Sequence, residues 1–247
     1  MSILFFILST ICLMVFLLIS VAYFTHAERK ILGAVQRRRG PNVIGVFGLL
    51  QPLSDGLKLL TNEQILPSSS DKIIFYLSPC ITFAVSLIGW AVIPFSQHSF
   101  LTELQLSSLY LLACSALGIY GILMAGWASN NKWALYGAAR GAAQMVSYEI
   151  PLALATIPVV MRTGSLNMND IVIGQQGGLF HWNAFHDPFL FVAFIIYFVS
   201  SIAEVNRGPF DMPETESELV AGYHTEYTGM RFALFFLSEY ANLFLVS

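Results

Sequence analysis

Residues 187–218 read DPFLFVAFIIYFVSSIAEVNRGPFDMPETESE, an apolar run that leads directly into a cluster of carboxylates. From Pro188 to Ala203 the run has no charged residue, and Asp187 followed by Pro188 is typical of a helix start. A helix of this length is about 24 Å long, whereas the hydrocarbon layer of a membrane is about 30 Å thick. We therefore expect a membrane-spanning helix whose last residue, Glu204, lies inside the layer near its inner edge.

The composition places the whole chain in the membrane class. Of its 247 residues 56% are hydrophobic and 11% are charged, whereas soluble domains carry about 25% charged residues. The net charge of −3 gives no reason to expect a nucleic acid partner. The three cysteines are isolated within apolar runs, so the sequence indicates no disulfide framework, iron–sulfur cluster or zinc site.

Six apolar runs are long enough to cross a membrane. They predict an all-α integral membrane fold with one domain over 1–247, and the expected spans are 3–24, 73–95, 106–128, 142–161, 188–205 and 232–247. Between the first two spans, residues 48–64 place Leu50, Leu53, Leu57 and Leu60 at helical spacing. This pattern predicts either an amphipathic helix lying in the membrane interface or a helix packed on protein.

The basic residues give the expected orientation. Eleven of the twelve Lys and Arg residues fall in the loops 26–72, 129–141 and 206–231, and only Arg162 falls on the other side. With six spans these three inner loops share one side of the membrane, which the positive-inside rule makes the matrix or cytoplasmic side. We therefore expect the N-terminus on the outside.

Three carboxylates are expected at membrane depth, where a charge at the bilayer centre costs roughly 2.5–3.5 kcal/mol. Along their helices, Glu149 lies about 14 Å beyond Arg140 and Glu239 about 12 Å beyond Arg231, and Glu204 ends its apolar run. Each is expected to face protein or water. Each could belong to a proton path or could simply hydrogen-bond a neighbouring helix, and the sequence leaves both open.

The inner loop 206–231 holds five more carboxylates within sixteen residues: Asp211, Glu214, Glu216, Glu218 and Glu226. Close carboxylates disfavour joint ionisation and titrate as coupled groups. Their position beside Glu204, on the side expected to be basic, favours a proton path over a solvated acidic loop. His224 and Tyr227 flank Glu226 and are candidate proton relays, with a structural histidine as the alternative.

The motifs that carry these residues resemble one family. AERKILGAVQRRRGPNVIGVFGLLQPLSDGLKLL (27–60), GAARGAAQMVSYEIP (137–151) and AEVNRGPFDMPETESELVAGYHTEYTGMRFALFFLSEY (203–240) are similar to subunit 1 of respiratory complex I, the NADH:ubiquinone oxidoreductase. The resemblance covers the chain from end to end. It implies a membrane subunit of a multi-subunit enzyme that couples ubiquinone reduction to proton translocation.

The resemblance also implies site residues. The quinone-chamber positions are Arg29, Arg38, Asp55, Phe210 and Asp211; the acidic-channel positions are Glu149, Glu204, Asp211, Glu214, Glu216, Glu218, Glu226, Tyr227 and Glu239; the supporting positions are Arg140 and Arg207. Ubiquinone is the expected substrate. The chain has no nucleotide-binding fingerprint and is expected to hold no cofactor, so NADH, FMN and the iron–sulfur clusters would belong to partner subunits.

The expected partners are the other membrane and peripheral-arm subunits of complex I, ubiquinone and membrane lipid. The expected location is the mitochondrial inner membrane, with the bacterial plasma membrane as the alternative. The family has eight spans where this chain offers six, so we expect either a second chain that supplies the last helices or a truncated sequence. Asn62-Glu63-Gln64 also stands where the family commonly has Lys-Glu-Pro.

The sequence leaves two other functions open. One is the equivalent subunit of a membrane-bound hydrogenase or a related complex, which would share the membrane motifs but not the NADH-oxidising partner. The other is a stand-alone proton-coupled transporter. The sequence shows no internal repeat, and this argues against the transporter because many transporters contain inverted repeats.

Overall fold

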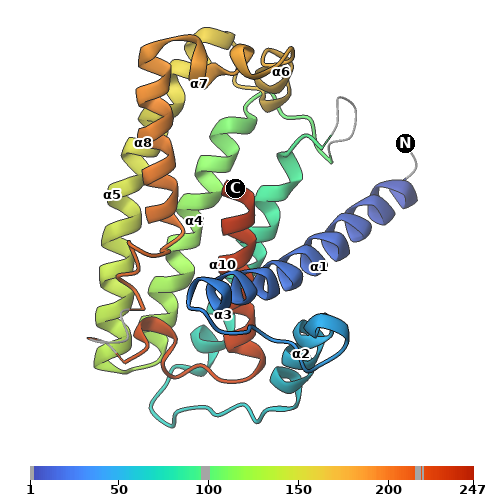
Figure 1. Cartoon of the computed structure of the whole chain (residues 1–247). Coiled ribbons are helices and arrows are strands. Elements are labelled where there is room, and N and C mark those ends of the chain that lie inside the picture. The colour runs from blue at the N-terminus through green and yellow to red at the C-terminus, as the bar shows by residue number, and fades with distance from the viewer. Residues whose placement is uncertain (1–2, 96–100, 215–217, 219) are drawn as a thin grey trace.

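The computed structural model describes residues 3–95, 101–214, 218 and 220–247, and within that part of the chain every regular element is helical (Figure 1). The longer helices are α1 (Ile3–Val35), α3 (Lys72–Ile88), α4 (Ser107–Ala128), α5 (Lys132–Thr163), α8 (Pro188–Glu204) and α10 (Met230–Val246). Among the described residues four segments are long and apolar enough to cross a membrane: Ile7–Val35, Lys72–Val92, Ser107–Ala128 and Lys132–Thr163. The helix α8 is a shorter apolar helix. The expected all-α membrane fold is therefore confirmed.

Short elements gather at the two ends of the helix bundle. At one end, which we name the cap end, α6 (Met168–Ile173), η3 (Leu179–His181) and α7 (Asn183–His186) connect α5 to α8 at the top of Figure 1. The opposite end, the loop end, carries η1 (Val46–Gly48), α2 (Gln51–Thr61) and η4 (Gly222–His224). The turn η2 (Gly89–Val92) continues α3.

Two helices extend beyond their apolar runs, α1 and α5. The helix α5 begins at Lys132, where the Asn131 side chain accepts a hydrogen bond from the Trp133 amide at 3.0 Å. Residues 132–141 were expected in an inner loop, and this expectation is wrong, because Lys132 and Arg140 both lie on α5. Hydropathy reports the apolar part of a helix, whereas the alanine-rich start of α5 favours helix through propensity.

The helices pack in the order α8, α5, α4, α3, α10 and α1, which puts α4 and α3 in the middle of the bundle. Small residues allow the central helices to approach closely. Gly121 of α4 lies against Thr82 of α3, and Gly126 lies against Ala134 and Ala138 of α5. Such contacts are typical of membrane bundles, where van der Waals packing takes the place of the hydrophobic effect between helices.

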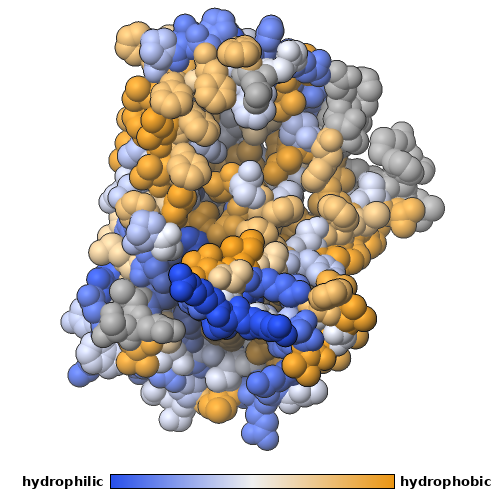
Figure 2. All heavy atoms as spheres, in the orientation of Figure 1, coloured by the Kyte–Doolittle hydropathy of each residue, from blue (hydrophilic) through white to orange (hydrophobic). Residues whose placement is uncertain are grey.

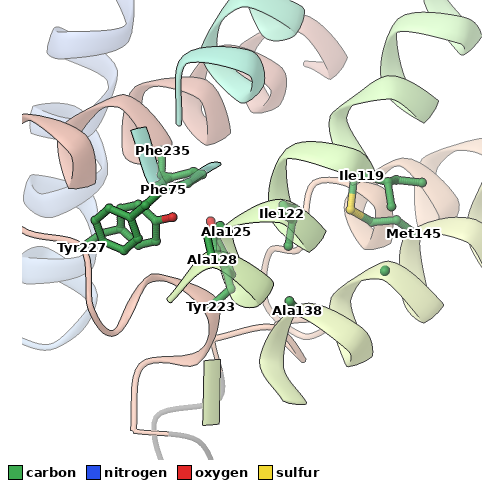
Figure 3. Close-up of a cluster of buried hydrophobic side chains, with 11 residues drawn as sticks. Phe75, Ile119, Ile122, Ala125, Ala128, Ala138, Met145, Tyr223, Tyr227 and Phe235 are labelled. Atoms are coloured by element: carbon green, nitrogen blue, oxygen red, sulfur yellow. The ribbon is translucent and has the colours of Figure 1, made fainter. Parts of the chain in front are cut away.

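A core cluster at the loop end joins α3, α4, α5 and α10 to residues 223 and 227 of the inner loop (Figure 3). Phe75 stacks on Tyr227, with ring centroids 4.1 Å apart and 6° between the ring planes. The Tyr227 hydroxyl lies 2.9 Å from Ser78 Oγ, in a buried hydrogen bond. Part of the inner loop 206–231 is thus built into the core of the bundle.

The segment 51–61 forms the expected amphipathic helix, α2, beside the loop end of α1. None of its residues is buried, and Leu53, Leu57 and Leu60 are 61–64% exposed. This exposure favours the membrane interface over packing on this chain. Figure 2 shows hydrophobic residues over the middle of the molecule and hydrophilic residues toward both ends, as a membrane protein requires.

Candidate functional site

The inner loop 206–231 folds back against α5. A side-chain carbon on Gly137 would come within 2.9 Å of backbone atoms of Pro213, Gly222 and Tyr223, so only glycine permits this approach. Nearer the middle of α5, the Gln144 side-chain amide donates to the carbonyls of Ala203 and Phe210, each at 2.7 Å. The loop is therefore held on α5 at both its beginning and its middle.

Three of the predicted carboxylates line one cavity. The cavity has a volume of about 180 Å³ and lies between α3, α4, α5, α8 and α10. Glu204 enters it from the end of α8, Glu239 from α10 and Glu214 from the inner loop. Glu149 lies on α5 outside the lining, half-buried, and acts electrostatically on Glu204. The structure thus brings Glu204, Glu214 and Glu239 together and leaves Glu149 beside them.

The other loop carboxylates have different surroundings. Glu218 forms an ion pair with Arg140 at 2.7 Å and is 59% exposed, and Glu226 accepts a hydrogen bond from Asn131 Nδ2 at 2.7 Å. Glu216 lies outside the described residues. The run of acidic residues is therefore divided, because Glu214 faces the cavity while Glu218 faces outward.

Tyr223 is a residue that the sequence reasoning missed. Its side chain is buried, and it lines the cavity beside Glu214 and Glu239. Burial raises the pKa of Tyr223 well above its usual value, and the carboxylates of Glu214, Glu239 and Asp211 raise it further. A tyrosine at this place keeps its proton and can donate a hydrogen bond into the cavity. The sequence shows Tyr223 only as an aromatic residue and does not indicate that it lines the cavity.

The two expected relay residues differ in what they can do. Burial lowers the pKa of His224 to about 4, so the imidazole is neutral near pH 7, with Nδ1 3.6 Å from Glu214 Oε1. Burial raises the pKa of Tyr227 to about 12, and this side chain is engaged by Phe75 and Ser78. His224 is therefore the better placed of the two to meet a channel carboxylate.

Arg207 joins α1 to α10. Its Nη2 lies 3.1 Å from Glu28 Oε2, and its Nε lies 3.2 Å from Glu239 Oε1. The Tyr240 hydroxyl donates to the same Glu28 oxygen at 2.6 Å, and the Arg207 guanidinium lies 4.6 Å from the centre of the Tyr240 ring. Sequence reasoning named Arg207 and Glu239 but missed Glu28 and Tyr240, although each directly precedes or follows a named residue.

The expected quinone-chamber residues form separate groups. Arg29 Nη1 lies 2.6 Å from Asp55 Oδ2, so this pair ties α1 to α2, and Gln51 Nε2 donates to the other Asp55 oxygen at 2.9 Å. Phe210 meets the ring of Tyr148 edge-on, with centroids 5.6 Å apart. Arg38 is exposed and donates to Gln36 at 2.7 Å. The structure brings Arg29 and Asp55 together but does not add Arg38 to them.

Comparison with known proteins connects this geometry to a family. A sequence profile of the family described as NADH dehydrogenase matches residues 8–247. The NADH-ubiquinone oxidoreductase chain 1 of Chondrus crispus is 55% identical over 230 residues, which is 93% of this chain and 69% of the relative. An NADH-quinone oxidoreductase subunit of Rickettsia peacockii is 54% identical over 231 residues, covering 94% of this chain and 67% of the relative. Its counterpart in Rickettsia prowazekii is 52% identical over 240 residues, covering 97% and 70%.

Proposed function

The chain belongs to the NADH dehydrogenase family as a membrane subunit of NADH:quinone oxidoreductase, and we propose that its loop end forms part of the quinone chamber and of the acidic channel that couples quinone reduction to proton translocation. The hydrogenase and stand-alone transporter alternatives are not favoured, because the similar proteins are named as parts of NADH-quinone or NADH-ubiquinone oxidoreductase.

One observation carries the proposal: the cavity that holds Glu204 and Glu239 also takes in Glu214 from the inner loop. A carboxyl at membrane depth is costly unless it faces protein or water, so Glu204 and Glu239, which meet Glu214 of the inner loop in one cavity, point to a function that uses their charge. Among the proposed quinone-chamber residues, the Arg29–Asp55 ion pair connects α2 to α1. Phe210 and Asp211 lie near the start of the inner loop that also carries Glu214.

The proposed coupling begins at the quinone. Reduction of a quinone to a quinol takes up two electrons, which partner subunits supply, and two protons. Withdrawal of these protons near Asp211 and Glu214 changes the charge of the cavity, and Glu204 and Glu149 pass the change laterally to antiporter-like subunits. Arg207 contributes through its ion pairs with Glu28 on α1 and Glu239 on α10. A change of charge on Glu239 alters the Arg207–Glu239 ion pair and therefore the connection that Arg207 makes between α1 and α10.

The partners and location follow from the same proposal. Other complex I subunits surround this chain, and ubiquinone and lipid contact the face between α1 and α2. NADH, FMN and iron–sulfur clusters lie in the peripheral arm. The protein is an integral membrane protein, and we place it in the mitochondrial inner membrane with its basic loops on the matrix side.

The test uses Glu204→Gln and Glu149→Gln in the assembled complex. Both variants should lose coupled quinone reduction and proton translocation while NADH oxidation by an artificial acceptor persists, because the substitutions remove only ionisable groups. Glu103→Gln is the matched control, since Glu103 is exposed and lies outside the carboxylate cavity. Full quinone reduction with normal pumping in both variants would show the proposal to be wrong.

A further inference from the structure

The helix α2 has few attachments of its own to the rest of the chain. None of its residues is buried, and the Arg29–Asp55 pair, which connects it to α1, is exposed. An exposed ion pair contributes little, because water surrounds both charges. Within this chain, the position of α2 therefore depends on how the residues just beyond its ends are held.

Beyond its C-terminal end, α2 is attached to the last residues of the inner loop. The Ile65 amide donates to Thr228 Oγ1 at 3.1 Å. Gly229 lies against the same segment, because a side-chain carbon built on it would be 3.3 Å from the Asn62 carbonyl oxygen. Gly229 also has a φ of +61°, in the region that favours glycine. The chain after α2 thus runs close beside the start of α10.

Arg231 adds side-chain contacts to this attachment. Its Nε and Nη2 donate to Gln64 Oε1 at 3.2 and 3.1 Å, and Nη2 also donates to the Tyr76 hydroxyl of α3 at 3.1 Å. Arg231 is only 4% exposed, and its guanidinium lies 4.2 Å from the centre of the Tyr76 ring and 5.3 Å from that of Phe75. Contacts from α3 therefore fix the guanidinium that holds Gln64.

Gln64 is the acceptor on which these side-chain contacts depend. A buried guanidinium needs hydrogen-bond acceptors, because leaving a charged group unsatisfied costs its full desolvation. Arg231 Nη1 has no hydrogen-bond partner within the described part of the chain, so the two bonds to Gln64 are a large share of those that Arg231 makes. Proline, which the family commonly has at this position, carries no side-chain acceptor and could not form them.

We propose that Gln64 and Thr228 are positioning residues for the quinone. By attaching the C-terminal end of α2 to the inner loop, they keep α2 at the distance from α1 that an isoprenoid tail needs. This inference rests on the proposed function, because it takes the face between α1 and α2 as the one that ubiquinone contacts. Both residues act through the position of α2 and not on the reacting headgroup.

The tail makes the expected effect selective. A ubiquinone with a long isoprenoid tail uses the face between α1 and α2 along much of its length, whereas an analogue with a single isoprene unit has little tail to place there. Displacement of α2 should therefore raise KM for the long-tailed quinone and leave kcat unchanged, because binding weakens while the reaction step stays the same. General damage to the fold would instead lower kcat with both quinones.

The test compares Gln64→Leu with Gln64→Glu in the assembled complex in proteoliposomes. Leucine removes the acceptor at similar size, whereas glutamate keeps an oxygen for Arg231. We expect Gln64→Leu to raise KM for long-tailed ubiquinone roughly ten-fold, the lower end of what one hydrogen bond to a charged group contributes, with KM for the single-isoprene analogue unchanged. Gln64→Glu should keep both KM values.

The matched control is Gln176→Leu, at an exposed glutamine of the cap end. An equal ratio of the two KM values in Gln64→Leu and Gln176→Leu would overturn the positioning role. The same rise in KM in Gln64→Glu as in Gln64→Leu would also overturn it, because the acceptor would then not be the cause.

Thr228→Val gives an independent measurement that also covers failed assembly of Gln64→Leu. Valine has the shape of threonine but lacks the oxygen that accepts from the Ile65 amide. Thr163→Val is its control, since the Thr163 hydroxyl donates within the cap end of α5. An unchanged KM ratio in Thr228→Val would count against the proposal. Loss of coupled quinone reduction in Glu204→Gln, with unchanged KM ratios in the Gln64 and Thr228 variants, would reject the positioning role alone and leave the proposed function intact.

Discussion

Gly137→Ala tests the docking of the inner loop on α5. The added methyl group would lie 2.9 Å from Gly222 Cα, from the Pro213 carbonyl oxygen and from the Tyr223 amide nitrogen. All three atoms belong to the backbone, so none can move aside by a side-chain rotation. Gly222 itself has a φ of +61°, in the region that favours glycine, and it has little freedom to shift.

Two opposing effects set the magnitude. Alanine favours a helix over glycine by about 1 kcal/mol, which would stabilise α5. Overpacking of one carbon into a closed contact costs about 1–3 kcal/mol. The net effect is therefore a destabilisation of the docked loop by about 0–2 kcal/mol, which at its upper end changes the docked population about 30-fold. Because Glu214 and Tyr223 follow the loop, the cavity loses two of its lining groups when the loop moves.

The assay compares quinone reduction and proton pumping in Gly137→Ala with those in Gly118→Ala. Both substitutions gain helix propensity, but only the first meets backbone atoms. We expect Gly137→Ala to lower both activities while NADH oxidation by an artificial acceptor and assembly on native gels are retained. Gly137→Leu brings more atoms into the same contact without this balance, so wild-type activity in both Gly137→Ala and Gly137→Leu would refute the placement of the loop against α5.

Two further predictions concern the loop end. Burial lowers the folded-state pKa of His224 to about 4, so below pH 6.5 the unfolded state binds more protons than the folded state. The free energy of unfolding should therefore fall as the pH drops from about 6.5 to 4, by about 3 kcal/mol at pH 4. Thermal inactivation of His224→Asn should depend less on pH between these values than that of the unsubstituted protein. Gln64→Ala should remove the acceptor of two Arg231 hydrogen bonds and cost about 1–3 kcal/mol, and the double variant with Arg231→Met should lose less than the sum, measured by thermal unfolding.

Apolar residues made most of the fold predictable. The run that ends at Ala203 gave α8 almost residue for residue, because hydrophobic length and an Asp-Pro start are both local signals. The start of α5 was missed, because its glycines and alanines are neither strongly apolar nor helix-breaking on a hydropathy scale. Asn131 was the available signal, since a side chain of this type caps helices.

The site was predictable in its residues but not in its pairings. Glu204 and Glu239 were identified from membrane depth, a property of one helix at a time. That Arg207 would hold Glu239 together with Glu28 depends on α1 and α10 lying side by side, and these helices are separated by most of the chain. The same holds for Gln64, which the sequence marked only as a departure from its family and which the structure shows as the acceptor for Arg231.

The weak attachment of α2 makes the lipid bilayer a structural part of this protein. An exposed ion pair such as Arg29–Asp55 contributes about 0–1 kcal/mol. Immersing the three leucines, each about 60% exposed, contributes roughly 1–2 kcal/mol per side chain. Immersion of the leucines would therefore contribute more to the position of α2 than the Arg29–Asp55 ion pair does. We therefore expect solubilisation in detergent to loosen this helix first, and a change in lipid thickness or headgroup to shift it without any change in the protein.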